Sequence, residues 1–218
     1  MTAMARQRLA PDERRAAILA AAREIFSRNT YAAVPMAEIA AAAGVTAPLI
    51  VFYFGSKQGL YTEVIRAAAD SLWHGLDAVP GDASLERLHD SVLFYVRHAE
   101  EHRAGFLSLL RGGNEAPPHD AARVIEQLRA RVCERILTDV AAAEAGTGER
   151  RPVDVADPAV RVAVRGYLGF VDAAIAHWLA LPDAEREHVP AVAIARAAVG
   201  AFTGGIDAMR GAHDVDGY

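Results

Sequence analysis

Three residues near the middle of the chain have the types and the spacing of a metal site. His98, Glu101 and His102 form an H-x-x-E-H sequence, the pattern of one class of zinc hydrolases. Side chains four residues apart lie on one face of a helix, so the two histidines could bind one cation. No convincing third ligand follows, and His102 falls at an expected helix end, where a histidine is favoured electrostatically. A helical-bundle metallohydrolase using these three residues is therefore the alternative hypothesis, and we expect no metal and no other cofactor.

Other reactive side chains do not form a catalytic pattern. Cys133 is the only cysteine, which excludes an internal disulfide, and its place in a helical pattern indicates a small core residue. The sequence contains neither a glycine-rich phosphate loop nor a Gly-x-Ser-x-Gly turn. We therefore expect that the protein is not an enzyme.

The composition favours a helical protein that acts in the cytoplasm. Of the 218 residues, 52% are apolar and 23% are charged, and alanine, the strongest helix former, is abundant. The N-terminal segment lacks the apolar core of a signal peptide. The longest apolar stretch, residues 158–181, is interrupted by ionisable side chains, which argues against a membrane partner; these are Arg161, Arg165, Asp172 and His177.

Hydrophobic spacing and breaker residues predict an all-α fold of about nine helices. Pro11 suits a first helical position, with Asp12 and Glu13 in the first turn, and Asp157 precedes Pro158 as an N-cap. Helices are expected over residues 11–29, 35–42, 46–52, from Ser56 onward, and over 82–102, 104–112, 119–145, 157–181 and 184–211. No strand-like alternation and no internal repeat is present.

Residues 35–54, PMAEIAAAAGVTAPLIVFYF, have the pattern of a helix-turn-helix. Gly44 suits the left-handed turn between two short helices, and Thr46 suits the N-cap of the second. Ile39, Val45 and Ile50 are spaced to pack the two helices together. Residues 1–57 carry seven basic and four acidic side chains, a net +3, whereas the whole chain carries −5 and the remainder therefore −8. This distribution favours contact between the N-terminal segment and a polyanion.

This region resembles the TetR family of one-component transcriptional regulators. The resemblance rests on RRAAILAAAREIFSRNTY from Arg14, on MAEIAAAAGVT, and on LIVFYFGSKQGLYTEVI, about 55 residues in all. It implies a three-helix DNA-binding domain over residues 1–57 and a ligand-binding and dimerisation domain over residues 58–218. It also implies a homodimer that binds a palindromic DNA operator, most often as a repressor released by a small effector.

The expected DNA-reading residues depart from the family pattern. Threonine is usual in the family where Val34 stands, lysine where Ala47 stands and tyrosine where Val51 stands. The second helix is therefore unusually apolar, so thymine methyl groups, phosphates and DNA shape should dominate recognition. The resemblance places Lys57 on a phosphate, and Arg6, Arg8, Arg14 and Arg15 form either a basic arm or a solvated tail. The expected DNA-binding residues are Thr46, Ala47, Pro48, Leu49, Phe52, Tyr53 and Lys57.

The resemblance also implies an effector cavity between the DNA-binding helices and the dimer interface. Aromatic side chains and a scarcity of polar groups favour an apolar or aromatic effector. The expected lining residues are Phe94, His98, Phe106, Leu110, Arg111, Cys133, Tyr167, Phe170 and Trp178, each of which could instead be ordinary core.

The last two long helices have the spacing of a coiled-coil-like seam, with glycines that permit close approach. They could pack within one chain, but the resemblance favours a four-helix interface between two chains. The expected interface residues are Gly166, Gly169, Ala173, Val192, Ala195, Val199, Phe202 and Ile206.

Overall fold

The computed structural model describes residues 10–110, 118–145 and 153–215. Every regular element in these ranges is a helix, so the all-α prediction is confirmed. The helices are α1 (Pro11–Phe26), α2 (Met36–Ala43), α3 (Ala47–Phe54), α4 (Lys57–Asp77), α5 (Leu85–Glu101), α6 (Arg103–Leu110), α7 (His119–Ala145), α8 (Pro158–Ala180), α9 (Asp183–Arg186) and α10 (Ala191–Val215).

Local sequence signals account for most of the helix boundaries. Pro11 begins α1, and the Glu13 carboxylate accepts a hydrogen bond from the Ala10 backbone N–H at 2.9 Å. Gly44 ends α2 with φ of 65°, the left-handed conformation that was predicted. Asp157 caps α8 by accepting from the Ala159 N–H at 2.8 Å. At these ends proline removes an N–H that would be unpaired, an acidic side chain accepts from another, and glycine adopts the left-handed conformation that ends the helix.

The predicted helix over residues 184–211 is instead two helices, α9 and α10. Pro190 lies between them, and its ring disfavours helical backbone at the residue before it, Val189. The Trp178 indole N–H donates to the Val189 carbonyl at 2.8 Å, which satisfies a backbone group that this break leaves without a helical partner. The described residues therefore contain ten helices where about nine were expected.

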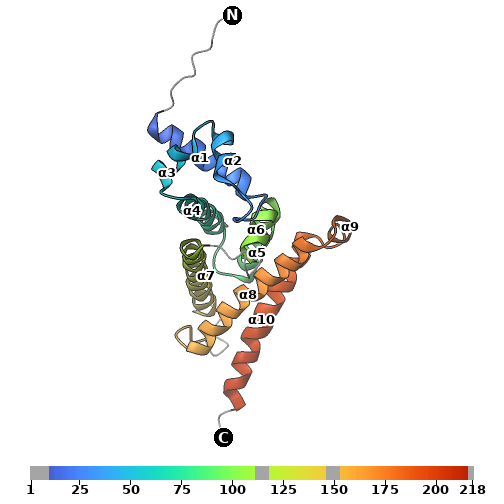
Figure 1. Ribbon diagram of the computed structural model, residues 1–218. Coiled ribbons are helices and arrows are strands. Elements are labelled where there is room, and N and C mark those ends of the chain that lie inside the picture. The colour runs from blue at the N-terminus through green and yellow to red at the C-terminus, as the bar shows by residue number, and fades with distance from the viewer. Residues whose placement is uncertain (1–9, 111–117, 146–152, 216–218) are drawn as a thin grey trace, which may run out of the picture.

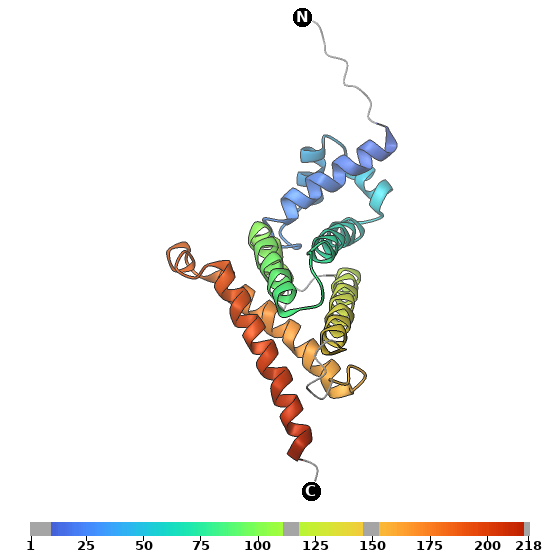
Figure 2. The ribbon, with the colours of Figure 1, turned by 180° about the vertical axis from the view of Figure 1, so that it is seen from behind.

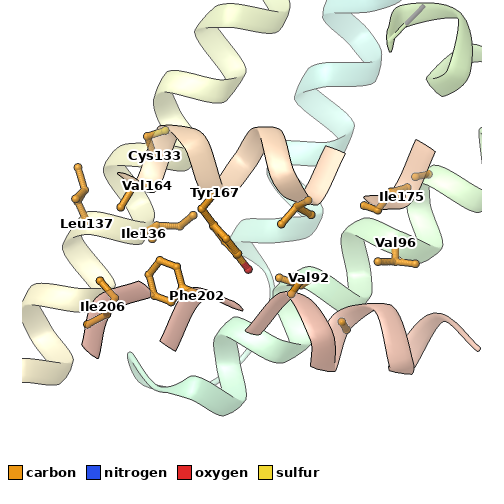
Figure 3. Close-up of a cluster of buried hydrophobic side chains, with 14 of the residues drawn as sticks. Val92, Val96, Cys133, Ile136, Leu137, Val164, Tyr167, Ile175, Phe202 and Ile206 are labelled. Atoms are coloured by element: carbon orange, nitrogen blue, oxygen red, sulfur yellow. The ribbon is translucent and has the colours of Figure 1, made fainter. Parts of the chain in front are cut away.

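The chain folds around two hydrophobic cores, visible as an upper and a lower group of helices in Figure 1. The N-terminal core joins α1, α2 and α3 to the first half of α4, and it continues past residue 57 to Ile65. Ala121 and Val124 at the start of α7 also belong to this core. The second core joins α5, α7, α8 and α10, with Tyr167 and Phe202 among its larger side chains (Figure 3). Helix α7 therefore contributes to both cores, and α4 packs against it.

Helices α8 and α10 lie side by side along the lower edge of the molecule, as both ribbon views show (Figures 1 and 2). Within α10, residues Ala191–Ala208 are long and apolar enough to cross a membrane by length and composition alone, and 22% of this segment is buried. Its buried side packs against α5 and α8. Its other side is exposed, so α10 presents a largely unpartnered apolar surface.

Candidate DNA interface and ligand cavity

The α2–turn–α3 unit exposes an apolar helix surface. Helices α2 and α3 meet at 96°, and fully buried Ile39 and Ile50 hold them together, as predicted. On the outer side of α3, Phe52 is 80% exposed and Val51 is 46% exposed. The Phe52 ring meets the Tyr53 ring edge to face, with centroids 5.4 Å apart. A large, exposed aromatic side chain on a short helix is unusual for a monomer surface and suits contact with a partner.

The structure places the other predicted DNA-binding residues of α3 on or near the same unit. Thr46 and Pro48 are exposed, whereas the remaining side chains are half-buried; these are Ala47, Leu49 and Tyr53. Thr46 occupies the N-cap position, but its hydroxyl accepts no cap hydrogen bond, so the predicted capping role is wrong. Pro48 in the first turn removes one of the N–H groups that such a cap would otherwise satisfy.

Lys57 begins α4 directly after the capping residue. The Ser56 hydroxyl accepts from the Gly59 N–H at 3.0 Å, which fixes this helix start. The Lys57 ammonium lies 4.5 Å from the centre of the Tyr31 ring, a cation–π contact, and partial burial lowers the pKa of Lys57. Tyr31 in turn packs on Tyr61, with ring centroids 4.9 Å apart. The Lys57 ammonium is thus held beside the N-terminus of α4. Both the ammonium and the helix terminus favour a bound anion there.

The arginines of the predicted basic arm do not share one environment. Arg15 pairs with Glu63 at 2.7 Å and lies over the Phe54 ring at 5.0 Å, so it packs against the N-terminal core. Arg6 and Arg8 lie outside the described residues. Val34, which replaces the threonine usual in the resembling family, is 1% exposed and belongs to the core. Its side chain is therefore not available to a phosphate, as the sequence suggested.

A cavity of about 630 Å³ lies between the two cores. Its wall comes from α1, α4, α5, α6, α7 and α8, and most of it is apolar. Phe26 and Ser27 contribute from the end of α1, Tyr61 and Trp73 from α4, and Ile136 from α7. Helix α1 and the second core therefore share one internal surface.

A buried polar cluster stands in this wall. The Asp172 carboxylate, on a residue only 8% exposed, accepts from the Tyr95 hydroxyl at 2.7 Å and from the Arg129 guanidinium at 2.6 Å. Burial first, and then the neighbouring carboxylate of Asp172, raise the pKa of Tyr95 well above its usual value. Helices α5, α7 and α8 are thus tied together at the cavity by one carboxylate.

Three of the predicted cavity residues line this cavity, namely His98, Phe106 and Tyr167. The Tyr167 hydroxyl is buried without a hydrogen-bond partner among the described residues, and burial raises its pKa (Figure 3). A buried phenol with no partner is costly, so this hydroxyl is available to a bound molecule.

Four of the other predicted cavity residues lie away from this wall. Cys133 and Trp178 are buried in the second core, and Phe94 stacks on His98 with centroids 5.9 Å apart without reaching the wall. Phe170 is 48% exposed and also lies off the wall. Leu110 is in α6, and Arg111 lies outside the described residues.

The sequence pattern alone did not reveal the polar cluster, although it held one signal for it. Asp172 follows Val171 on the inward side of α8, between buried Tyr167 and Ile175. A carboxylate on a buried helix face requires a partner, which predicts a cation or hydroxyl opposite. Arg129 and Tyr95 are those partners, but their identities depend on how α5 and α7 pack.

The structure brings the H-x-x-E-H residues together. The metal-binding atoms of His98, Glu101 and His102 all lie within 4.8 Å of one another, at the end of α5. Both histidines also line the cavity.

The predicted seam on α10 is largely occupied within the chain. Ala195, Phe202 and Ile206 are buried because this side of α10 packs against the second core, so the structure does not leave them free for a partner. Val192 and Val199 are half-buried. The neighbouring exposed side carries mostly small residues, with the charged Arg196 and Asp207 at its edge; the small ones are Ala193, Ala197, Gly200, Ala201, Gly204, Gly205 and Ala208.

The predicted small residues of α8 are exposed. Gly166, Gly169 and Ala173 lie on one side of this helix, together with Val162, which is 72% exposed. A side chain added at Gly166 or Gly169 would meet nothing within 4 Å, and the same holds for Gly200 on α10. Helices α8 and α10 therefore expose apolar surface with room for close approach.

Comparison with known proteins agrees with this architecture. Residues 18–64 match the family model described as bacterial regulatory proteins, tetR family, and residues 85–156 match that of the tetracyclin repressor-like C-terminal domain. The chain is 29% identical over 159 residues to the HTH-type transcriptional activator FasR of Mycolicibacterium smegmatis, covering 72% of each protein.

Solved structures share the fold over most of their length. A tetR-family transcriptional regulator from Streptomyces coelicolor has a TM-score of 0.75 at 25% identity, covering 95% of this chain and 86% of that one. The transcriptional regulator FadR from Bacillus subtilis, in complex with stearoyl-CoA, has a TM-score of 0.60 at 16% identity, covering 85% and 95% respectively.

Proposed function

The chain belongs to the TetR family and is a transcriptional regulator, and from this premise we propose that it acts as a homodimer whose affinity for a palindromic operator is set by a small molecule in the cavity. The observation that carries the proposal is the cavity itself, because one wall includes both α1 of the DNA-binding unit and the buried cluster of the second core. A ligand there would contact both units at once. It would therefore favour one arrangement of the reading heads by its differential affinity.

DNA recognition is proposed to combine apolar reading with phosphate contacts. Exposed Phe52 and Val51 would contact thymine methyl groups in the major groove, since such side chains cannot form bidentate bonds to guanine. Lys57, at the N-terminus of α4, would contact a phosphate. Thr46, Ala47, Pro48, Leu49 and Tyr53 complete the proposed surface around the start and end of α3.

The proposed dimer interface is the exposed side of α8 and α10. The small residues Gly166, Gly169 and Gly200 would let the helices of two copies approach closely, and exposed Val162 and Phe170 would be buried at its edges. A two-fold arrangement would place two α3 helices on successive major grooves, which requires a palindromic operator.

The proposed effector is an apolar molecule, either aromatic or with a long acyl chain, that carries a hydrogen-bonding group. The apolar wall favours such a body, and the unpartnered Tyr167 hydroxyl favours a polar group near it. The similarity in fold to a regulator solved with stearoyl-CoA supports the acyl alternative. A volume of about 630 Å³ lies within the ordinary range for small-molecule sites.

The sign of regulation depends on where the operator lies relative to the promoter. Repression relieved by the effector is the first proposal, because a dimer bound over a promoter blocks it. The 29% identity to a named activator specifically favours activation as the second candidate. In both cases we propose that the protein acts in the cytoplasm and catalyses no reaction. We do not propose a metallohydrolase centred on His98.

Selection of bound duplexes from a random DNA pool tests the DNA part of this function. Full-length protein should enrich a sequence with two-fold symmetry, and a Phe52→Ala variant should enrich it poorly. Enrichment of a single half-site, or none by a folded dimer, would contradict the proposal. The enriched duplex then serves as the probe for changes in DNA affinity on adding stearoyl-CoA or a simple aromatic acid. Tyr167→Phe is the matched variant, since it lacks only the unpartnered hydroxyl.

A further inference from the structure

The last turn of α5 gathers three metal-ligating side chains that DNA binding does not use. His98, Glu101 and His102 are spaced three and four residues apart, which places them on one face of the helix. Their ligand atoms lie within 4.8 Å of one another, and the two imidazole rings are 4.6 Å apart at 63°. Among the residues that the structure describes, this is the one group of three or more such side chains that could hold a metal ion.

The surroundings of the cluster also suit a cation. His98 is half-buried, whereas Glu101 and His102 are exposed, so a cation can reach the ligand atoms from solvent. The two imidazoles and the carboxylate supply nitrogen and oxygen ligands of the kinds that Zn²⁺ takes in proteins.

We propose that His98, Glu101 and His102 form a binding site for a divalent transition-metal cation of the Zn²⁺ class at the edge of the cavity. Two imidazole nitrogens and one carboxylate oxygen select Zn²⁺, Co²⁺ or Ni²⁺ over Mg²⁺ and Ca²⁺, which prefer all-oxygen sites. Three protein ligands leave at least one coordination position open. Because both histidines line the cavity, this position is accessible from it.

A cation here would join the ligand cavity to the corner between α5 and α6. His102 ends α5, and its carbonyl accepts from the Phe106 N–H at 3.0 Å, which fixes the first turn of α6. A Cβ on Gly105 in the next turn would lie 3.6 Å from Ser27 Cα, so α6 abuts the end of α1. The bound cation would therefore stiffen a corner that contacts the DNA-binding unit.

Calorimetric titration of the metal-free full-length protein with Zn²⁺, and Co²⁺ absorption in parallel, test the site without DNA or effector. We expect one tight cation per chain and an intense Co²⁺ band from fewer than six ligands. Loss of an outer-shell partner already costs about 10–100-fold in metal affinity, so His98→Ala, Glu101→Gln and His102→Ala should each cost at least about tenfold. His177→Ala, which removes an exposed histidine at the end of α8, should change nothing.

Circular dichroism of each variant keeps the result interpretable. Glu101 and His102 are exposed, so their variants should retain the fold even if half-buried His98 proves sensitive. Absence of saturable Zn²⁺ binding by the parent protein would overturn the proposal, and so would equal affinity in folded His102→Ala. A weak Co²⁺ spectrum that does not depend on either histidine would overturn it as well.

Discussion

Replacing Phe52 by alanine should weaken DNA binding while leaving the fold intact. Phe52 is 80% exposed, and its described ring contact is with neighbouring Tyr53 on the same helix. Because this side chain contributes little to the N-terminal core, the melting temperature of the variant should match that of the parent. Any loss in DNA affinity can then be assigned to the interface.

The expected loss of DNA affinity follows from the area of the Phe52 side chain that DNA could cover. Full burial of a phenylalanine side chain contributes about 1.5–3 kcal/mol. Since Phe52 is 80% exposed, the part available to DNA is about four fifths of that value, or about 1.2–2.4 kcal/mol. This corresponds to roughly an 8- to 60-fold increase in Kd, with the upper end requiring complete burial against the groove.

Fluorescence anisotropy with the selected operator, over a series of salt concentrations, measures this change. The affinity should fall, but the salt slope should not, because Phe52 carries no charge and releases no counterion. The substitution Phe54→Ala is the contrasting control, since Phe54 is 9% exposed and its loss should lower stability instead. A Kd within about twofold of the parent, with an unchanged melting temperature, would refute apolar reading by this helix.

Three other changes test the remaining parts of the argument. Lys57→Ala should weaken binding to all duplexes and lower the salt slope by about one; an unchanged slope would contradict a phosphate contact. Asp172→Asn should lower the free energy of unfolding in urea by about 1–3 kcal/mol, because the Tyr95 hydroxyl and Arg129 lose their anion, although partial exposure of Arg129 moderates the loss. An effect under about 0.5 kcal/mol would mean that the pair contributes nothing measurable. Gly200→Leu meets open space within the chain, so it should keep its helix content and sediment as a monomer; a stable dimer would contradict the proposed interface.

Local rules were sufficient to predict most of the helical framework. Gly44 and Pro11 mark boundaries because each residue restricts or frees a particular backbone angle, which depends little on the rest of the protein. Pro190 carried the same kind of information, but the helical spacing on both sides masked the break between α9 and α10. Thr46 shows the limit of such rules, since its position was predicted and its hydrogen bond was not.

The cavity could be predicted only in part because its wall depends on packing between distant helices. Tyr167 was among the expected lining residues, and it lines the cavity. Trp178, on the same buried side of α8, was indistinguishable by sequence, yet its indole N–H bonds to Val189 beyond the end of that helix. Periodicity identifies the residues that share a face, whereas the neighbour of that face is fixed by tertiary structure.

The same difference between periodicity and packing explains why the predicted seam of α10 packs within the chain. It also supports the proposed dimer. Ala195, Phe202 and Ile206 have the spacing of a seam, and they do pack against helices, but those helices belong to the same chain. A helix whose large apolar residues are satisfied internally would ordinarily present a charged outer face. Helix α10 instead exposes a row of alanines and glycines over most of the apolar segment Ala191–Ala208, and the charged side chains of that segment are Arg196 and Asp207. Because this second face exposes apolar surface without serving the monomer, it supports the proposal that another copy of the chain covers it.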